Sequence, residues 1–234
     1  MAVLPRYNRN VSALSEEECN LLSSKRVVVV GCGGLGGIVI EDLARIGVGH
    51  IRVIDGDVFE ESNLNRQIIM TEADLGRKKA ECAADRVRSI NSLVEVEPVV
   101  AYLDRKNSGS HIRGFDCVVD CLDNLEGRFW LAHAANNLGI PIVYGAIAGW
   151  FGQVCTIFPG DESFPEIYGT LDNGTESQHK QLGNLPFTAH SIAAIQAAEC
   201  VKVLLGRGDC IRNRLLMVDL FGGTAEELPI GPEK

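Results

Sequence analysis

Positive charge is scarce in this sequence. The chain has 22 lysine and arginine residues against 31 aspartate and glutamate residues, a formal net charge of -9 at pH 7. Binding to the phosphate backbone of nucleic acids depends on lysine and arginine. The charge balance therefore argues against a general nucleic-acid-binding protein, and nucleic acid is not an expected partner.

Long apolar runs are also absent. The most apolar long stretch, 189–205, is not a convincing membrane span, because it is interrupted by His190, Gln196, Glu199 and Lys202. The first ten residues, MAVLPRYNRN, lack the apolar core of a secretory signal. We therefore expect a cytoplasmic protein that does not bind membranes.

The chain has eight cysteines but no C-x-x-C pair. Most of them lie inside apolar runs, where a reduced cysteine acts as a small buried hydrophobic residue. A chain of 234 residues can bury a full core without disulfides. The sequence also contains no internal repeat, low-complexity segment or domain linker. We expect one domain over residues 1–234, with an N-terminal arm and helix at 1–25 and a long polar loop at 161–186.

Apolar runs alternate with amphipathic stretches along most of the chain. The run 27–30 is continuously β-branched, as expected for a strand buried on both faces of a parallel sheet. Further strands are expected at 51–55, 94–103, 117–121, 141–148 and 215–219, the last of them before a polar tail, and helices at 35–46, 76–90, 125–138 and 188–205. Pro98 suggests that the 94–103 strand lies at an edge or contains a break.

The alternation of predicted strands and helices ends after residue 148, because the next apolar stretch follows without an intervening helix. We therefore expect the α/β class, with a Rossmann-like, mostly parallel sheet. Helices should cover both faces, and antiparallel strands should be added in the C-terminal half.

A glycine cluster separates the first predicted strand from the first predicted helix. Gly31, Gly33 and Gly36 form the pattern G-x-G-x-x-G, which permits a tight turn and lets phosphates approach a helix N-terminus. Asp55 follows 19 residues after Gly36, where a carboxylate can bind ribose hydroxyls. The pattern alone also suits a nicotinamide or flavin enzyme, or glycines that serve only helix–strand packing.

The segment SNLNRQ, residues 62–67, begins seven residues after Asp55. A Rossmann-type redox enzyme has no need for Arg66 in this position. An enzyme that splits a triphosphate does, because a guanidinium stabilises the charge that develops on phosphoryl oxygens. The alternative is a solvated surface loop.

The segment GRKKAE, residues 76–81, puts Arg77, Lys78 and Lys79 at a predicted helix N-terminus. Cations are disfavoured there, because the helix dipole is positive at that end. A nearby bound anion would make the placement more favourable. The alternative is a flexible basic turn in water.

The segment DCLDN, residues 120–124, follows an apolar strand. The carboxyl ends of strands are where open α/β sheets bind ligands, and a lone carboxylate such as Asp123 suits Mg²⁺ when a phosphate lies opposite. The alternative is an N-cap for the helix that begins near residue 125. One of Asp123 and Asn124 could cap the helix while the other binds the metal.

Six segments occur in the order seen in the MoeB/ThiF/HesA family, the bacterial relatives of ubiquitin-activating enzymes. They are RYNRN, GCGGLGG, VIDGD, ESNLNRQ, GRKKAE and DCLDN. The resemblance runs from about residue 6 to about residue 219, and SIAAIQAAECVKVLLG resembles a late helix of the family. The glycine motif is widespread, but its combination with S-N-L-x-R-Q and D-C-x-D-N is specific.

The resemblance implies that ATP is a substrate used with Mg²⁺. Family members adenylate the C-terminal glycine carboxylate of a small ubiquitin-like sulfur-carrier protein that ends in Gly-Gly, and they release pyrophosphate. The implied catalytic residues are Arg66, Lys79, Asp123 and Arg6, with Asp123 on Mg²⁺. The implied nucleotide-binding residues are Gly31, Gly33, Gly34, Gly36, Asp55, Asp57, Asn63, Gln67 and Lys79. Family members form homodimers, in which Arg6 would reach the phosphates of the partner subunit's ATP.

The sequence departs from this family chiefly in its cysteines, since Asn10, where the family often has glutamine after RYNR, puts little in doubt. Relatives usually carry two C-x-x-C pairs for structural zinc, and neither 159–169 nor the C-terminal end contains cysteine. The loop 161–186 also lacks a cysteine that could take the activated carrier as a thioester, so we predict a zinc-free enzyme that only adenylates. Three alternatives remain open: adenylation of a peptide C-terminus or a tRNA-bound carboxylate, a nucleotide-binding module without catalysis, and an NAD-binding redox protein.

Overall fold

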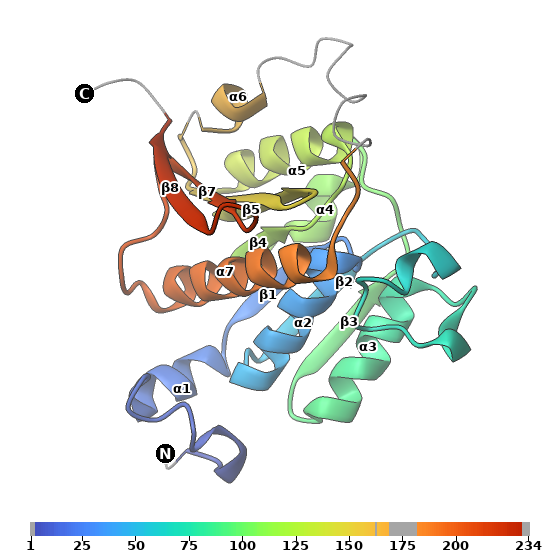
Figure 1. The fold of residues 1–234 in the computed structure, drawn as a ribbon. Helices are drawn as coiled ribbons and strands as arrows, with labels where there is room; N and C mark the ends of the chain where they lie inside the picture. The colour runs from blue at the N-terminus through green and yellow to red at the C-terminus, as the bar shows by residue number, and fades with distance from the viewer. Residues whose placement is uncertain (1–2, 162, 169–181, 231–234) are drawn as a thin grey trace.

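A computed structural model describes residues 3–161, 163–168 and 182–230 of the chain. One eight-stranded sheet runs through them in the order β3-β2-β1-β4-β5-β6-β7-β8 (Figure 1). Strands β3, β2, β1, β4 and β5 are parallel, and β6, β7 and β8 continue the sheet in antiparallel pairs. The strand bounds are β1 Arg26–Val30, β2 His50–Ile54, β3 Glu95–Val99, β4 Cys117–Asp120, β5 Ile142–Ala148, β6 Phe151–Ile157, β7 Arg214–Asp219 and β8 Thr224–Pro229. The predicted fold class is confirmed.

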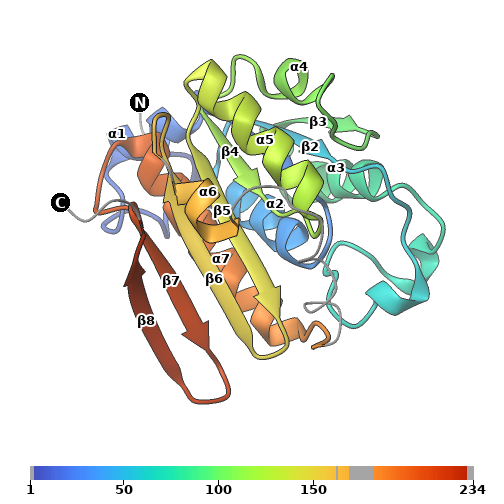
Figure 2. The same cartoon turned by 90° about the horizontal axis from the view of Figure 1, so that it is seen from above.

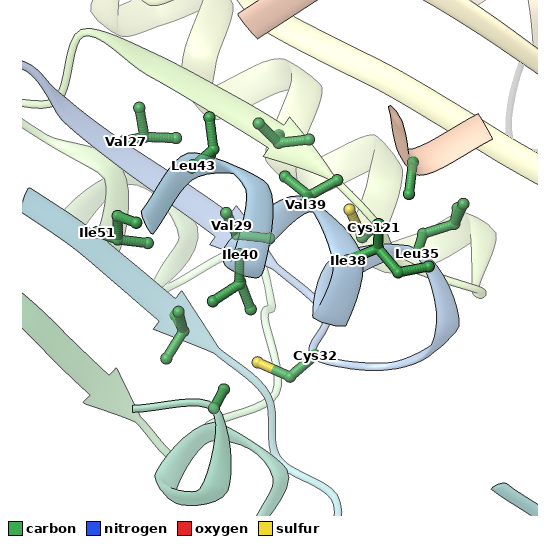
Figure 3. Packing of buried hydrophobic residues seen from close by; sticks show 14 of the residues in the cluster. Val27, Val29, Cys32, Leu35, Ile38, Val39, Ile40, Leu43, Ile51 and Cys121 are labelled. Carbon is green, nitrogen blue, oxygen red and sulfur yellow. The ribbon is translucent and has the colours of Figure 1, made fainter. Parts of the chain in front are cut away.

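Helices cover both faces of the sheet (Figure 1). Their bounds are α1 Glu16–Leu22, α2 Gly34–Ile46, α3 Lys79–Ile90, α4 Ser108–Ile112, α5 Leu125–Leu138, α6 Ser163–Tyr168 and α7 Pro186–Leu205, with short 3₁₀ turns η1 Pro5–Tyr7, η2 Glu61–Asn63 and η3 Glu72–Asp74. Because side chains alternate along a strand, β1 contributes to two separate cores. Val27 and Val29 pack in one core with α2, α3 and α7 (Figure 3 shows part of it). Val28 and Val30 pack in the other core with α4 and α5.

Most predicted elements are present with bounds shifted by a few residues. Pro98 lies in β3, which is the edge strand, as its sequence position suggested. The helix expected from residue 76 begins at Lys79, because the preceding residues form a turn that hydrogen bonds to the segment after β2.

Two short elements of the C-terminal half were not predicted from the sequence. The polar tail after residue 219 contains β8, which pairs with β7 as an exposed hairpin at the edge of the sheet (Figure 2). The long loop expected at 161–186 contains the short helix α6, and its residues 169–181 lie outside the described part of the chain. Each element has only six residues, which is too few to establish a clear hydrophobic period.

Candidate nucleotide-binding site

The glycine turn lies between β1 and α2 at the carboxyl end of the parallel strands. Gly31 has φ +92°, and a Cβ atom there would lie 2.5 Å from the Cys121 carbonyl oxygen. A Cβ atom at Gly36 would lie 1.7 Å from the Gly31 carbonyl oxygen. Both positions therefore require glycine.

The first turn of α2 has no side-chain cap within the described residues. Its N-cap residue is Gly33, which has no side chain to accept a hydrogen bond from the helix amides. The first amides of a helix lack partners within the helix, and together with the helix dipole they form an anion-binding site. The turn can therefore hold phosphate groups.

Asp55 lies beside this turn, directly after β2. Its two carboxylate oxygens accept hydrogen bonds from the backbone amides of Cys32 and Asp57, at 2.7 and 2.8 Å. Burial raises the pKa of Asp55 above its usual value, although these two hydrogen bonds and the nearby Lys79 act in the opposite direction. The carboxylate is therefore fixed at the strand end, where it can bind ribose hydroxyls.

Lys79 is the first residue of α3, and only 9% of its side chain is exposed. Its ammonium group lies 3.2 Å from one oxygen of Asp57, and the other oxygen accepts a 2.6 Å hydrogen bond from the hydroxyl of Tyr102. Burial acts to raise the pKa of Asp57, but Tyr102 and Lys79 outweigh it and hold this pKa below its usual value. The site thus contains a buried cation with an ionised partner.

The loop that contains η2 covers the N-terminus of α2. A Cβ atom at Gly34 would lie 3.3 Å from Cγ of Arg66, and one at Gly33 would lie 3.5 Å from Nε2 of Gln67. Arg66 hydrogen bonds to the Ser62 carbonyl oxygen and the Asn65 side chain. Within the described residues it has no carboxylate partner, so its positive charge is not neutralised by the protein there.

Two predicted phosphate-binding residues on this loop are buried. Asn63 accepts a 3.1 Å hydrogen bond from the Glu60 amide, and the Arg66 and Gln67 amides both donate to its carbonyl oxygen. This structural role holds the loop, so contact between Asn63 and phosphate stays a prediction. The side-chain oxygen of Gln67 is buried, with no hydrogen-bond partner among the described atoms.

Asp123 follows β4, the strand next to β1, so it lies at the same edge of the sheet as the glycine turn. Asn124 is the N-cap of α5, and its side chain accepts a 2.7 Å hydrogen bond from the Gly127 amide. Asp123 is exposed, and no hydrogen bond of its carboxylate occurs within the part of the chain described here. Asn124 is therefore the helix cap, and metal binding by Asp123 stays a prediction.

The sequence did not indicate the residues that hold the Asp123 loop. Arg128 is buried, donates to the carbonyl oxygens of Leu122 and Gly145, and forms a 3.2 Å ion pair with Asp120. Burial raises the pKa of Asp120, and Arg128 acts against this shift. The signal available in the sequence was an arginine inside an apolar helix, and a buried arginine is normally paired.

Two further predicted features lie apart from the site. Arg77 pairs with Asp74 and Asp85, at 2.6 and 2.8 Å, so these carboxylates account for one of the three cations in GRKKAE without a bound anion. Arg6 donates to the side chain of Asn91, the C-cap residue of α3, at the end of that helix opposite Lys79.

The N-terminal arm is docked by Tyr7. Tyr7 packs on Gly47, the C-cap of α2, and accepts a 2.7 Å hydrogen bond from Asn91. Helix α2 has 13 residues, so its two ends are about 20 Å apart. In this arrangement, Arg6 lies at the end of α2 away from the glycine turn of its own chain.

The described residues include no helix that is long and apolar enough to cross a membrane. In the same residues no three histidine, cysteine, aspartate or glutamate side chains are grouped so as to hold a metal ion. A metal at Asp123 would therefore depend on ligands from the nucleotide, as Mg²⁺ sites commonly do.

The model of the ThiF family matches residues 7–234. This chain belongs to the ThiF family. It is 39% identical to the SAMP-activating enzyme E1 of Haloferax volcanii, with 97% of this chain and 85% of that protein covered. It is 33% identical to the sulfur carrier protein adenylyltransferase of Thermus thermophilus, with 97% and 87% covered.

A third relative is the molybdopterin-synthase adenylyltransferase of Haemophilus influenzae, with 31% identity and 96% and 94% of the two chains covered. Among solved structures, MccB of E. coli in complex with MccA-N7isoASN has a TM-score of 0.86 and 20% identity, covering 100% of this chain and 73% of MccB. The structural likeness supports the fold, and the resemblance to a ThiF-type adenylyltransferase found in the sequence is confirmed.

Proposed function

We propose that this protein uses ATP to adenylate the C-terminal glycine carboxylate of a small ubiquitin-like sulfur-carrier protein, with release of pyrophosphate. The names of its relatives support an adenylyltransferase that acts on such carriers. The observation that carries the proposal is the position of Arg66. Its stem lies against the N-terminus of the helix that would hold phosphates, and its guanidinium has no carboxylate partner within the described residues.

The reaction brings two anions together. An oxygen of the carrier's carboxylate forms a bond to the α-phosphorus, and the bond from that phosphorus to the oxygen bridging the β-phosphate breaks. The electron pair of the broken bond leaves with pyrophosphate. The carboxylate is already ionised at pH 7, so no general base is needed. Positioning and positive charge therefore supply most of the catalysis.

The described side chains divide this work. The amides of the glycine turn would hold phosphate oxygens, and Asp55 would hold the ribose. Arg66 and Lys79 would neutralise charge that develops on the phosphate oxygens, with Arg66 as the main stabiliser. Asn63, Gln67 and Asp57 would complete the nucleotide-binding set.

Mg²⁺ fits the residues at the end of β4. Asp123 is exposed, is not used as a helix cap, and offers the single carboxylate that Mg²⁺ often takes from a protein beside nucleotide phosphates. When bound, the ion would offset phosphate charge. The contribution of this chain is to hold the Asp123 loop through the buried Arg128.

We further propose that the active unit is a homodimer in which Arg6 reaches the ATP of the partner subunit. The arm carries Arg6 at the end of α2 remote from its own glycine turn, which supports action across an interface rather than within one chain.

The test is exchange of labelled pyrophosphate into ATP. We expect exchange with a ubiquitin-like protein that ends in Gly-Gly, encoded in the same genome, and none with the same protein lacking its last glycine. Exchange with a short peptide or with tRNA, but not with any Gly-Gly carrier, would favour the alternative carboxylates. Tight binding of NAD without any exchange would favour a redox protein and overturn the proposal.

A further inference from the structure

The exposed Tyr102 has no role in the proposed adenylation reaction, yet it contacts residues of the nucleotide-binding site. Tyr102 lies after β3 and is 70% exposed, yet its side chain is held at both ends. Its ring lies against Gly56, where a Cβ atom would come within 2.8 Å of three ring carbons. Its hydroxyl donates the 2.6 Å hydrogen bond to Asp57. Gly56 therefore admits the ring, and the ring brings the hydroxyl to the carboxylate.

The Asp57 carboxylate is shared between two donors. One oxygen accepts from Tyr102, and the other lies 3.2 Å from the Lys79 ammonium. The Asp57 carbonyl oxygen also accepts a 3.1 Å hydrogen bond from the Lys79 amide, the first amide of α3. Asp57 thus holds Lys79 by both backbone and side chain, and Tyr102 restricts rotation of the carboxylate that does so.

Lys79 is close to the remainder of the site. Its charge acts on the pKa values of the Asp55 carboxyl and the Cys32 thiol, which belong to the ribose position and the glycine turn. A lysine side chain has four rotatable bonds, so an ammonium held at one point must be fixed by its partners.

We propose that Tyr102 is a positioning residue, whose hydroxyl fixes the Asp57 carboxylate and, through it, the Lys79 ammonium beside the phosphate-binding turn. The inference rests on the proposed function and assigns Tyr102 no contact with substrate. Loss of the hydroxyl leaves Lys79 bound to a carboxylate that rotates more freely, so its charge spends less time where the phosphates react.

The first experiment compares Tyr102→Phe with the unchanged enzyme in carrier adenylation. We expect kcat to fall about tenfold, the loss of one hydrogen bond to a charged group, while KM for ATP changes little. Ser110→Ala is the matched control, because it removes another exposed hydroxyl hydrogen bond, to the Asn107 carbonyl oxygen, that involves neither Asp57 nor Lys79. Unchanged kcat in Tyr102→Phe would overturn the inference.

A double-mutant cycle separates a role through Asp57 from a direct one. In the Asp57→Asn background, Tyr102→Phe should cost less than about twofold further, because the partner that it positions has already lost its charge. Full additivity would overturn the inference. So would a normal Tyr102→Phe together with a raised KM for ATP in Tyr102→Leu, since that pattern means that the ring binds nucleotide.

The pH profile provides a second readout. The charged and titratable groups that act on Asp57 include Lys78, Lys79, Tyr102 and Asp55. Because the tyrosine hydrogen bond helps to lower the pKa of Asp57, its removal should shift the acid limb of kcat to higher pH. An unmoved acid limb would count against the inference.

A third readout does not depend on the proposed function. The rate at which an amine-acylating reagent modifies Lys79, followed by mass spectrometry, should rise several-fold in Tyr102→Phe and stay unchanged in Ser110→Ala. If the unchanged enzyme fails to adenylate any carrier, the proposed function fails but this measurement still decides the role of Tyr102. Equal labelling of Lys79 in the unchanged enzyme, Tyr102→Phe and Ser110→Ala would overturn the positioning role of Tyr102.

Discussion

Arg66 illustrates how a single side chain determines the chemistry of this site. Its stem packs against Gly34 at the N-terminus of α2, and its guanidinium is held by the Ser62 carbonyl oxygen and the Asn65 side chain. Both partners are neutral, so the charge remains available to a bound anion. A core or structural arginine in this protein looks different, since Arg128 is buried and paired with Asp120.

Replacement of Arg66 by alanine should nearly abolish carrier adenylation without unfolding the protein. Removal of one donor that stabilises transition-state charge costs on the order of 2.7–4 kcal/mol, or about 10²–10³ in rate. The measurement is single-turnover formation of the carrier adenylate, with circular dichroism to check the fold. Arg207→Ala is a matched control, because it removes an exposed arginine paired with Glu18 far from the turn. Near-normal adenylation by folded Arg66→Ala would contradict the assignment.

At the residue scale, the sequence indicated the groups that belong to short motifs and missed the groups that act through space. Gly31, Gly36 and Asp55 could be assigned because backbone geometry and strand ends dictate them. Tyr102 could not, since its link to Asp57 spans 45 positions and depends on the absence of a side chain at Gly56. Such contacts are set by tertiary packing, which no local pattern reports.

At the level of elements, the site depends on how α2 and α3 are held together. Their N-termini present the phosphate-binding turn and Lys79, respectively. Glu41 on α2 accepts hydrogen bonds from Arg45 on the same helix and from Arg86 on α3. Only 11% of the Glu41 side chain is exposed, so this ion-pair network is partly shielded from solvent.

Glu41→Gln should lower the free energy of unfolding at pH 7 by about 1.5–3 kcal/mol, the range for hydrogen bonds to charged groups. Burial acts to raise the pKa of Glu41, but the two arginines outweigh it and hold the folded pKa below its usual value. The stabilisation is therefore fully present above the unfolded pKa and is lost as pH falls through the folded one. Denaturant unfolding at a series of pH values measures it.

The control for Glu41→Gln is Arg88→Gln, which removes an exposed ion pair with Asp85 on α3. Exposed pairs contribute little, so the control should change stability by about 0.5 kcal/mol or less. The difference in free energy of unfolding between Glu41→Gln and the unchanged protein should become smaller below pH 4.5. If this difference in free energy of unfolding increases at acid pH, the network does not act through an ionised Glu41.

The elements with a clear hydrophobic period were predictable, and the polar ones were not. Helix α5 begins and ends where the sequence placed it, because Asn124 caps it and Gly139 ends it with φ +71°. Strand β8 has all six residues exposed and pairs with β7 alone. Its sequence therefore has no alternation of apolar and polar residues that would mark a face packed on the core. The short α4 was not predicted for a similar reason, since five residues do not establish a period.

At the scale of the whole molecule, we predict that the purified protein contains no stoichiometric zinc. Thiolate is the form that binds zinc, and burial raises the pKa of the Cys121 and Cys155 thiols well above their usual value. Elemental analysis after exhaustive dialysis checks this. About one zinc per chain would contradict the prediction, and His190 together with His179, which lies outside the described residues, would then be tested as ligands.

The last prediction concerns the dimer and the arm that carries Arg6. Tyr7 and Asn91 hold the arm at the C-terminal end of α2, so Arg6 in the same chain lies far from the turn that would bind ATP. Arginine is the residue most often supplied to a transferring phosphate from a second site, because its charge is permanent and its donors form a rigid fork. We therefore expect Arg6→Ala to be inactive while its ATP-binding residues remain intact.

Subunit complementation tests this arrangement. Arg6→Ala and Arg66→Ala chains, each inactive alone, are mixed under conditions that exchange subunits. If Arg6 acts across the interface, one of the two sites in a mixed dimer receives both arginines, because the Arg6→Ala chain supplies Arg66 and its partner supplies Arg6. Activity then returns to at most half of the normal value per mixed dimer. If each arginine serves the ATP of its own chain, both sites lack one arginine and no activity returns, which would restrict Arg6 to its own subunit.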